Sequence, residues 1–190
     1  MKKIIFTLIA AITLVACKFG DQEARRPVSQ KSGSFIDESI EMNKQLVAEE
    51  EEIIKKIIEK DSTEEYHASN GGFWYYYQEQ DTSATKTPKF GDTVIFDYDI
   101  TTLDDQVIYS EEELSTRTYV MDKEDIFSGL REGLKIMKEG ETVTFLFPSH
   151  KAFGFYGDKG KIGTNIPIKS TVTLIDIKSE TNQDSLNTKQ

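Results

Sequence analysis

Alternating apolar and polar residues predict β-strands in the second half of the chain. Val94, Phe96, Tyr98 and Ile100 alternate with more polar residues, which is the period of a strand with one buried face. Similar patterns predict four more strands, at 107–109, 117–121, 142–147 and 171–177. Turn-forming residues separate these segments, so the pattern predicts about five short strands.

Helical spacing of apolar residues predicts two helices. Residues from Ile36 to Ile58 form a thin apolar stripe, which predicts an acidic helix opening at Ser34 and reaching about Lys60. A denser stripe from Ile126 to Met137, followed by Gly140, predicts a short amphipathic helix. One short helix among about five strands indicates an α+β fold.

The chain divides by composition into successive segments. Five consecutive aromatic residues, Phe73 to Tyr77, predict a further strand, and a polar linker follows them. We interpret the order as a leader (1–16), a tether (17–33), an acidic helical segment (34–66), the aromatic strand and linker (67–90), a globular domain (91–178) and a disordered tail (179–190).

The leader carries a targeting signal. Lys2 and Lys3 precede an apolar run that is too short to cross a bilayer. Small residues lead into Cys17, and this pattern resembles the lipobox of bacterial lipoproteins, which implies an N-terminal cysteine bearing palmitate or related acyl chains. An ordinary signal peptide followed by a free cysteine is the alternative.

Charge and composition exclude several classes of function. Lys and Arg total 23 against 33 Asp and Glu, a net charge of −10, which argues against a nucleic-acid partner. Two histidines and one cysteine cannot build a His- or Cys-rich metal centre or an internal disulfide. We therefore expect no cofactor and no metal.

Residues 91–178 resemble an FKBP-type peptidyl-prolyl cis-trans isomerase domain. The similarity rests on segments in one order, namely Gly91 to Tyr98, Leu103 to Ser110, Ile126 to Leu134, Met137 to Glu141, Pro148 to Gly154 and Ile166 to Ile177. The resemblance implies an antiparallel β-sheet wrapped on one short α-helix. It also implies catalysis of Xaa–Pro isomerisation, which requires neither nucleophile nor cofactor because no covalent bond breaks.

The same resemblance implies an apolar substrate pocket. Its residues would be Tyr98, Tyr109, Ile126, Phe127, Leu130, Phe153, Ile166 and Leu174, with the Phe127 N–H donating to a peptide carbonyl. Three positions depart from the family, which has aspartate, tryptophan and tyrosine where this chain has Ser110, Leu130 and Phe153. We expect weakened turnover, because one lost hydroxyl removes about 0.5–1.5 kcal/mol and leucine leaves a wider pocket floor.

Two polar segments adjoin this predicted pocket. Four glycines spaced through 154–163 indicate a long, mobile rim. The carboxylates of Glu111 to Glu113 are expected on one loop without a basic or buried partner, and they are interpreted as surface residues or as contacts to cations.

The whole chain also resembles the gliding-motility-associated lipoprotein isomerases of Bacteroidota-type bacteria. This match adds the lipobox, the acidic helix, the aromatic run and residues 108–114. It implies a lipid anchor in the bacterial cell envelope, on the outer membrane facing the periplasm, and Xaa–Pro segments of envelope or motility-machinery proteins as partners. A catalytically weak chaperone or scaffold remains an alternative, and so does a homodimer formed through 34–60.

Overall fold

The computed structural model describes residues 32–180, with side chains from Phe35 onward. The leader, Cys17, almost all of the tether and the tail from 181 lie outside the described residues. The chain divides into two compact units, ending at Ser39 and beginning at Ile40. The second unit holds the predicted domain.

Helix α2 spans Ser32–Lys60, as the apolar stripe predicted. It includes the last two residues of the predicted tether and ends before residue 66, so 61–66 is not helical. Exposed ion pairs join Glu51 to Lys55 and Glu52 to Lys56 along the helix. Exposed pairs of this kind contribute little to stability, so the buried positions of α2 matter more to its placement.

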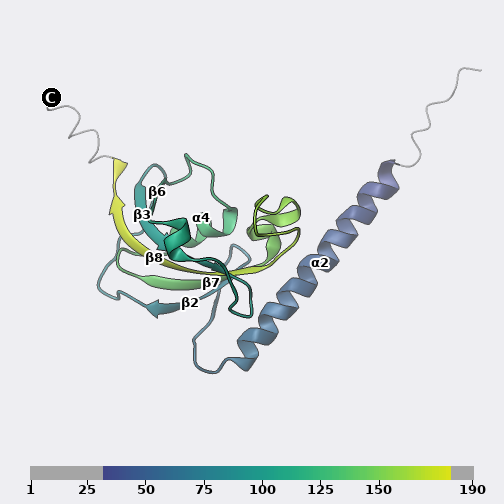
Figure 1. Ribbon diagram of the computed structural model, residues 1–190, viewed down its shortest axis with the longest axis horizontal. Helices are drawn as coiled ribbons and strands as arrows, with labels where there is room; N and C mark the ends of the chain where they lie inside the picture. The colour runs from purple at the N-terminus through teal and green to yellow at the C-terminus, as the bar shows by residue number, and fades with distance from the viewer. Residues whose placement is uncertain (1–31, 181–190) are drawn as a thin grey trace, which may run out of the picture. The chain divides into compact units, whose positions relative to one another are not determined.

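The strands form one antiparallel sheet. Its order is β1 (His67–Ala68), β2 (Trp74–Glu79), β7 (Thr142–Phe147), β8 (Ile168–Lys178), β3 (Thr93–Tyr98) and β6 (Arg117–Val120). A small hairpin of β4 (Ile100–Thr101) and β5 (Val107–Tyr109) joins it through β8. Figure 1 shows the long strand β8 beside β7. The predicted α+β class and antiparallel sheet are confirmed.

The aromatic run belongs to this sheet and its core. Strand β2 pairs with β7, placing Tyr75 opposite Phe145. Phe73 is 2% exposed, and its ring lies 5.8 Å from that of Phe145 and 5.4 Å from that of Phe147. The run is therefore structural at its buried positions.

Helix α4 (Ser128–Leu134) lies across one face of the sheet (Figure 1) and is shorter than the apolar stripe suggested. Ile126 and Phe127 precede it in extended backbone. The residues after Leu134 form tight turns, which place Met137 in the core. Three further short helices appear, α3 (Glu111–Leu114) and the 3₁₀ turns η1 (Ser149–Lys151) and η2 (Gly154–Tyr156).

Candidate active site

The structure gathers the predicted pocket residues around one end of the core, except for Ile166. Tyr98, Leu130 and Leu174 belong to the buried core, and four partly buried residues pack against it, namely Tyr109, Ile126, Phe127 and Phe153. Ile166 is 37% exposed and lies outside this cluster. These seven residues form an apolar wall to which five separate segments of the chain contribute.

Phe127 presents an aromatic ring and an unused backbone donor. Its ring centroid lies 5.0 Å from that of Phe153 and 5.5 Å from that of Phe147. Its carbonyl accepts from Arg131 N at 3.2 Å, as expected one residue before a helix. Its N–H donates to no other atom of residues 32–180. This N–H is available to a peptide carbonyl.

Tyr98 supplies a buried phenol to this wall. The side chain is 6% exposed, and its ring lies 5.4 Å from that of Phe96. Its hydroxyl makes no hydrogen bond within the described part of the chain, and Ser110 instead caps α3 by accepting from Glu113 N at 3.3 Å. Tyr98 therefore keeps a free donor while the neighbouring Phe153 has none.

Leu130 and Leu174 close the base of the wall. Each is 0% exposed, with buried core side chains around it. The wider floor expected at Leu130 stays a prediction.

The rim of the site is fastened rather than loose. The Asp158 carboxylate accepts from Tyr109 Oη, from Gly160 N at 2.7 Å and from Ile162 N at 2.9 Å. Lys161 N donates to Tyr109 Oη at 3.0 Å. A single carboxylate thus organises the glycine-containing turn and joins it to a wall residue, while the mobility expected of the rim stays a prediction.

Lys161 adds an ionic contact across the rim. Its Nζ lies 2.6 Å from a Glu113 carboxylate oxygen and 4.7 Å from the centroid of the Tyr109 ring. The prediction that residues 111–113 form a loop without a basic partner was wrong, because Ser110 starts a short helix there and Lys161 reaches it. The polar contacts of the rim thus converge on Tyr109.

Titration of Asp158 should loosen the rim. Burial acts to raise the pKa of Asp158, but hydrogen bonds from Tyr109, Gly160 and Ile162 outweigh it and hold the pKa below its ordinary value. A lowered carboxyl pKa stabilises the folded rim above the ordinary value of about 3.9, and this stability is lost as pH falls through the lowered pKa. We expect the Gly160 amide resonance to titrate in that range and the titration to vanish in Asp158→Asn. A Gly160 amide chemical shift that does not change with pH below about 4 would contradict this assignment.

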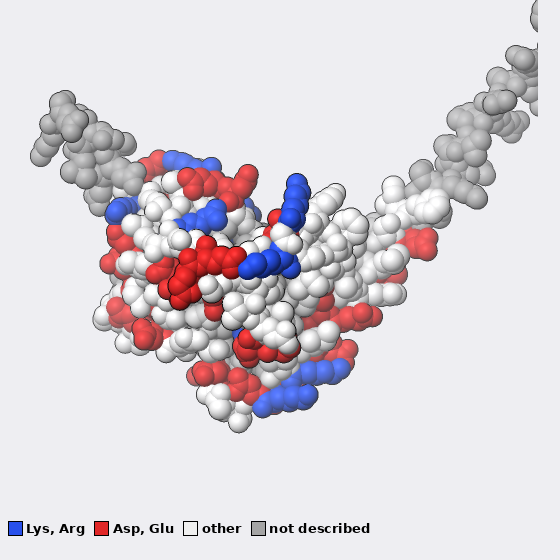
Figure 2. Space-filling view, viewed as in Figure 1, with Lys and Arg blue, Asp and Glu red and all other residues white. Residues whose placement is uncertain are grey.

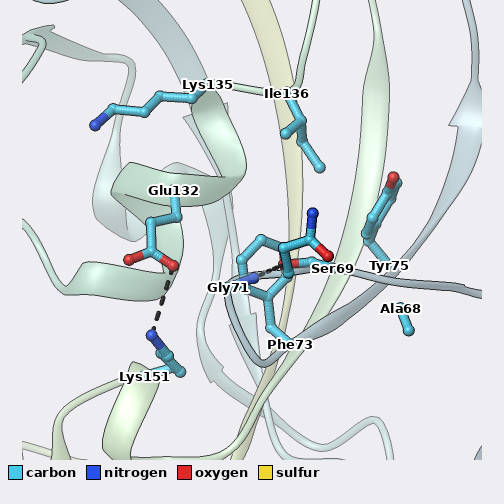
Figure 3. Close-up of a pocket in the computed structure, with 10 residues that line it drawn as sticks. Ala68, Ser69, Gly71, Phe73, Tyr75, Glu132, Lys135, Ile136 and Lys151 are labelled. Atoms are coloured by element: carbon cyan, nitrogen blue, oxygen red, sulfur yellow. Dashed lines mark hydrogen bonds and ion pairs between the residues drawn. The ribbon is translucent and has the colours of Figure 1, made fainter.

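A second cavity lies between the β1–β2 turn, α4 and η1, apart from the predicted pocket residues. It has a volume of about 590 Å³, and its lining includes Tyr75, Glu132, Lys135 and Lys151. Figure 3 shows Glu132 pointing toward Lys151, whose Nζ lies 3.5 Å from Glu132 Oε2. That oxygen is buried and accepts no hydrogen bond from residues 32–180. Part of the cavity lining is therefore the ion pair between Glu132 of α4 and Lys151 of η1.

The surface charge is mainly acidic. On the face shown in Figure 2, carboxylates spread over much of the surface while lysines and arginines form smaller groups. Among residues 32–180, no group of three or more His, Cys, Asp or Glu is arranged to hold a metal ion. Within the same residues, no helix combines the length and apolar character needed to span a membrane.

Asp158 and Lys161 were not identified as site residues from the sequence. The spacing of Asp158 to Gly160 is typical of an aspartate that binds its own following backbone. Their partner Tyr109, however, lies 49 residues away from Asp158 and 52 away from Lys161, and no local pattern connects them.

Comparison with known proteins agrees with this geometry. The family model of FKBP-type peptidyl-prolyl cis-trans isomerases matches residues 84–175. A search of curated protein sequences gave no significant match.

Solved structures extend the comparison to the fold. A peptidyl-prolyl cis-trans isomerase from Pseudomonas syringae pv. tomato aligns with a TM-score of 0.56 and 17% identity, covering 72% of this chain and 96% of its own. FkpA from Escherichia coli aligns with a TM-score of 0.57 and 23% identity, covering 94% of this chain and 82% of its own. With the apolar wall and the family match, the chain contains an FKBP-type peptidyl-prolyl cis-trans isomerase domain.

Proposed function

We propose that this protein catalyses Xaa–Pro isomerisation at the apolar wall formed around Phe127. Rotation of an Xaa–Pro amide crosses a barrier of about 18–20 kcal/mol and passes through a twisted form with less charge separation. An apolar, water-poor wall favours that form over the planar amide. The observation that carries the proposal is the free Phe127 N–H beside packed aromatic rings, because it can hold a carbonyl while the amide rotates.

Protein segments, rather than free amino acids, fit this site. Phe155 and Tyr156 of η2 are 69% and 83% exposed, and their rings lie 5.5 Å apart. They directly follow the pocket residue Phe153 and Gly154 in the chain. This exposed aromatic pair can bind apolar side chains that flank a proline in an unfolded client.

Refolding of a proline-limited client tests the proposed function. Uncatalysed prolyl isomerisation takes tens of seconds or more, so it produces a slow phase that an isomerase accelerates. We expect the protein to accelerate this phase in proportion to its concentration. Protection from aggregation without any acceleration would favour the alternative, a chaperone or scaffold with a degraded pocket.

Activity should rise when the family hydroxyl is restored at Phe153. Phe153→Tyr places a phenol beside Phe127, and one neutral hydrogen bond adds about 0.5–1.5 kcal/mol, or up to about tenfold in kcat/KM. Phe155→Tyr is the matched control, because it adds the same hydroxyl at an exposed position. Equal rates in both variants would show that the Phe153 position does not contact substrate.

We propose that the mature protein is anchored through lipidated Cys17 in the bacterial envelope, on the outer membrane facing the periplasm. The lipobox-like sequence before Cys17 supports this placement, and the resemblance of the whole chain makes motility-machinery proteins the candidate clients. Labelling with a palmitate analogue should mark the protein, and Cys17→Ser should abolish the label and release the protein from membranes. Unlabelled protein would favour an ordinary signal peptide.

A homodimer through 34–60 remains a further prediction. Phe35, Ile36, Ile40 and Met42 of α2 are 64%, 60%, 47% and 65% exposed, more apolar surface than a solitary helix ordinarily leaves in water. Light scattering should give twice the chain mass. A monomer mass across the measured concentrations would remove the prediction.

A further inference from the structure

Glu50 is a buried carboxylate that joins α2 to the isomerase domain. It is 4% exposed, and its two oxygens accept hydrogen bonds from Ser149 N and Ser149 Oγ, both at 2.7 Å. No ion pair to Glu50 occurs among residues 32–180. Glu50 also lies outside the family match, which begins at residue 84. The two hydrogen bonds from Ser149 are therefore its only described polar partners.

Helix α2 has other contacts with the domain, so Glu50 is not needed merely to hold it. Ile54, one turn further along, is 0% exposed. Lys55 Nζ lies 5.8 Å from the centroid of the Trp74 ring. The Glu50 carboxylate therefore has a specific role only through the residue that it binds, Ser149.

Ser149 begins the turn η1, which leads directly into the predicted pocket. Ser149 O accepts from Ala152 N at 2.9 Å, and Phe153 is the next residue. At the other end of η1, Ser128 Oγ donates to Lys151 O at 3.3 Å, and Lys151 pairs with Glu132 (Figure 3). The turn η1 is thus held between Glu50 on one side and α4 on the other.

Two aromatic residues of the wall, Phe127 and Phe153, depend on the position of η1. Phe153 follows η1 in the chain by two residues. Phe127 immediately precedes Ser128, whose hydroxyl donates to the Lys151 carbonyl of η1. The rings of Phe127 and Phe153 lie 5.0 Å apart. A displacement of η1 would therefore change the spacing of the two rings.

We propose that Glu50 is a positioning residue for the isomerase pocket, which it serves by fixing η1 through Ser149. Hydrogen bonds to a carboxylate are roughly twice as strong as neutral ones, and Ser149 is 2% exposed, so water cannot replace them at low cost. The N-terminal helix thereby becomes part of the catalytic framework, although it touches no substrate. This inference rests on the proposed isomerase function.

Glu50→Gln tests the proposal in the full chain purified in detergent. The amide keeps the size of the side chain, but only its oxygen can accept, so Ser149 Oγ must turn to accept from the amide nitrogen and both charge-assisted hydrogen bonds become weaker neutral ones. We expect kcat/KM for Xaa–Pro peptides to fall about fivefold to tenfold, and the Phe127 and Phe153 amide resonances to shift. Glu49→Gln, the same change at an exposed neighbouring position, should leave both unchanged.

The combination of readouts separates the inference from the proposed function. Glu50→Gln could lower only the thermal stability, with kcat/KM and both amide resonances equal to those of Glu49→Gln. That result would overturn the positioning role and leave a structural one. If the unaltered protein shows no turnover, the proposed function fails, but shifted resonances and weaker Xaa–Pro peptide binding in Glu50→Gln would still support positioning. Ser149→Ala should produce the same changes. The double variant with Glu50→Gln should be little worse than either single variant, because both substitutions weaken the same contact.

Discussion

Phe127→Pro should lower kcat/KM about tenfold further than Phe127→Ala does. Alanine removes the ring but keeps the N–H, whereas proline removes both, so their ratio isolates the donor. Proline fits the position, because Phe127 has φ −61° and its N–H bonds to no described residue. A tenfold ratio corresponds to about 1.4 kcal/mol of transition-state stabilisation.

The two variants are measured on the same Xaa–Pro peptide, with circular dichroism as a check that both remain folded. The ring itself should also matter, because it packs against Phe147 and Phe153. Phe127→Ala alone should therefore be slower than the unaltered protein. If proline and alanine give equal rates, the Phe127 N–H does not act on the substrate.

Gly129→Ala should reduce the free energy of unfolding by about 1–3 kcal/mol, the usual cost of overpacking a core. Alanine normally stabilises a helix relative to glycine by about 1 kcal/mol, so the sign is the informative part. Here an added Cβ would lie 2.5 Å from a ring carbon of Phe147 and 2.8 Å from Lys151 O. The second contact is backbone of η1, which cannot swing aside as a side chain can.

Gly163→Ala is the matched control, because its added Cβ would meet Ile166 at 3.9 Å, an ordinary contact. Its stability should stay within about 0.5 kcal/mol of the parent or increase slightly. Urea denaturation of both variants gives the comparison directly. A stabilised Gly129→Ala would mean that α4 and η1 are not in close contact, and it would weaken the argument for Glu50 as well.

The strands were predictable because the alternation of apolar and polar residues lies within each short segment. Thr142–Phe147 ends at Pro148 as expected, and the alternation from Val94 onward places Phe96 and Tyr98 on the buried face. Helix α4 was overestimated, because the apolar residues flanking it serve the core from extended backbone and tight turns. Periodicity reports which side chains are buried, and it does not fix the backbone that carries them.

The site was predictable only in part, and for a related reason. The resemblance selected residues that the structure packs in or against one core, apart from Ile166, since they lie within recognisable motifs. The polar contacts that shape the wall are long-range pairs, such as Glu50 with Ser149 and Asp158 with Tyr109. No spacing rule relates partners 99 or 49 residues apart, so these contacts required the three-dimensional structure.

The apolar wall and the fastened rim suggest how rate and selectivity divide within the site. In the proposed function, Phe127, Tyr98 and their neighbours would supply the apolar surface that favours the twisted amide. Tyr109, held by Asp158 and Lys161, fixes the rim that borders this surface. The exposed pair Phe155 and Tyr156 extends the contact to flanking client residues. Changes to this pair should therefore alter the choice of client more than the rate on short peptides.

The most direct test of catalysis at this wall is the exchange rate between cis and trans isomers of short Xaa–Pro peptides. The measurement uses magnetisation-exchange NMR on the purified protein, across a panel of residues before proline. We expect exchange faster than the uncatalysed rate, slowed by Phe127→Ala and slowed further by Phe127→Pro. Exchange at the uncatalysed rate for every peptide in the panel would contradict an isomerase and leave the domain a binding module with the same fold.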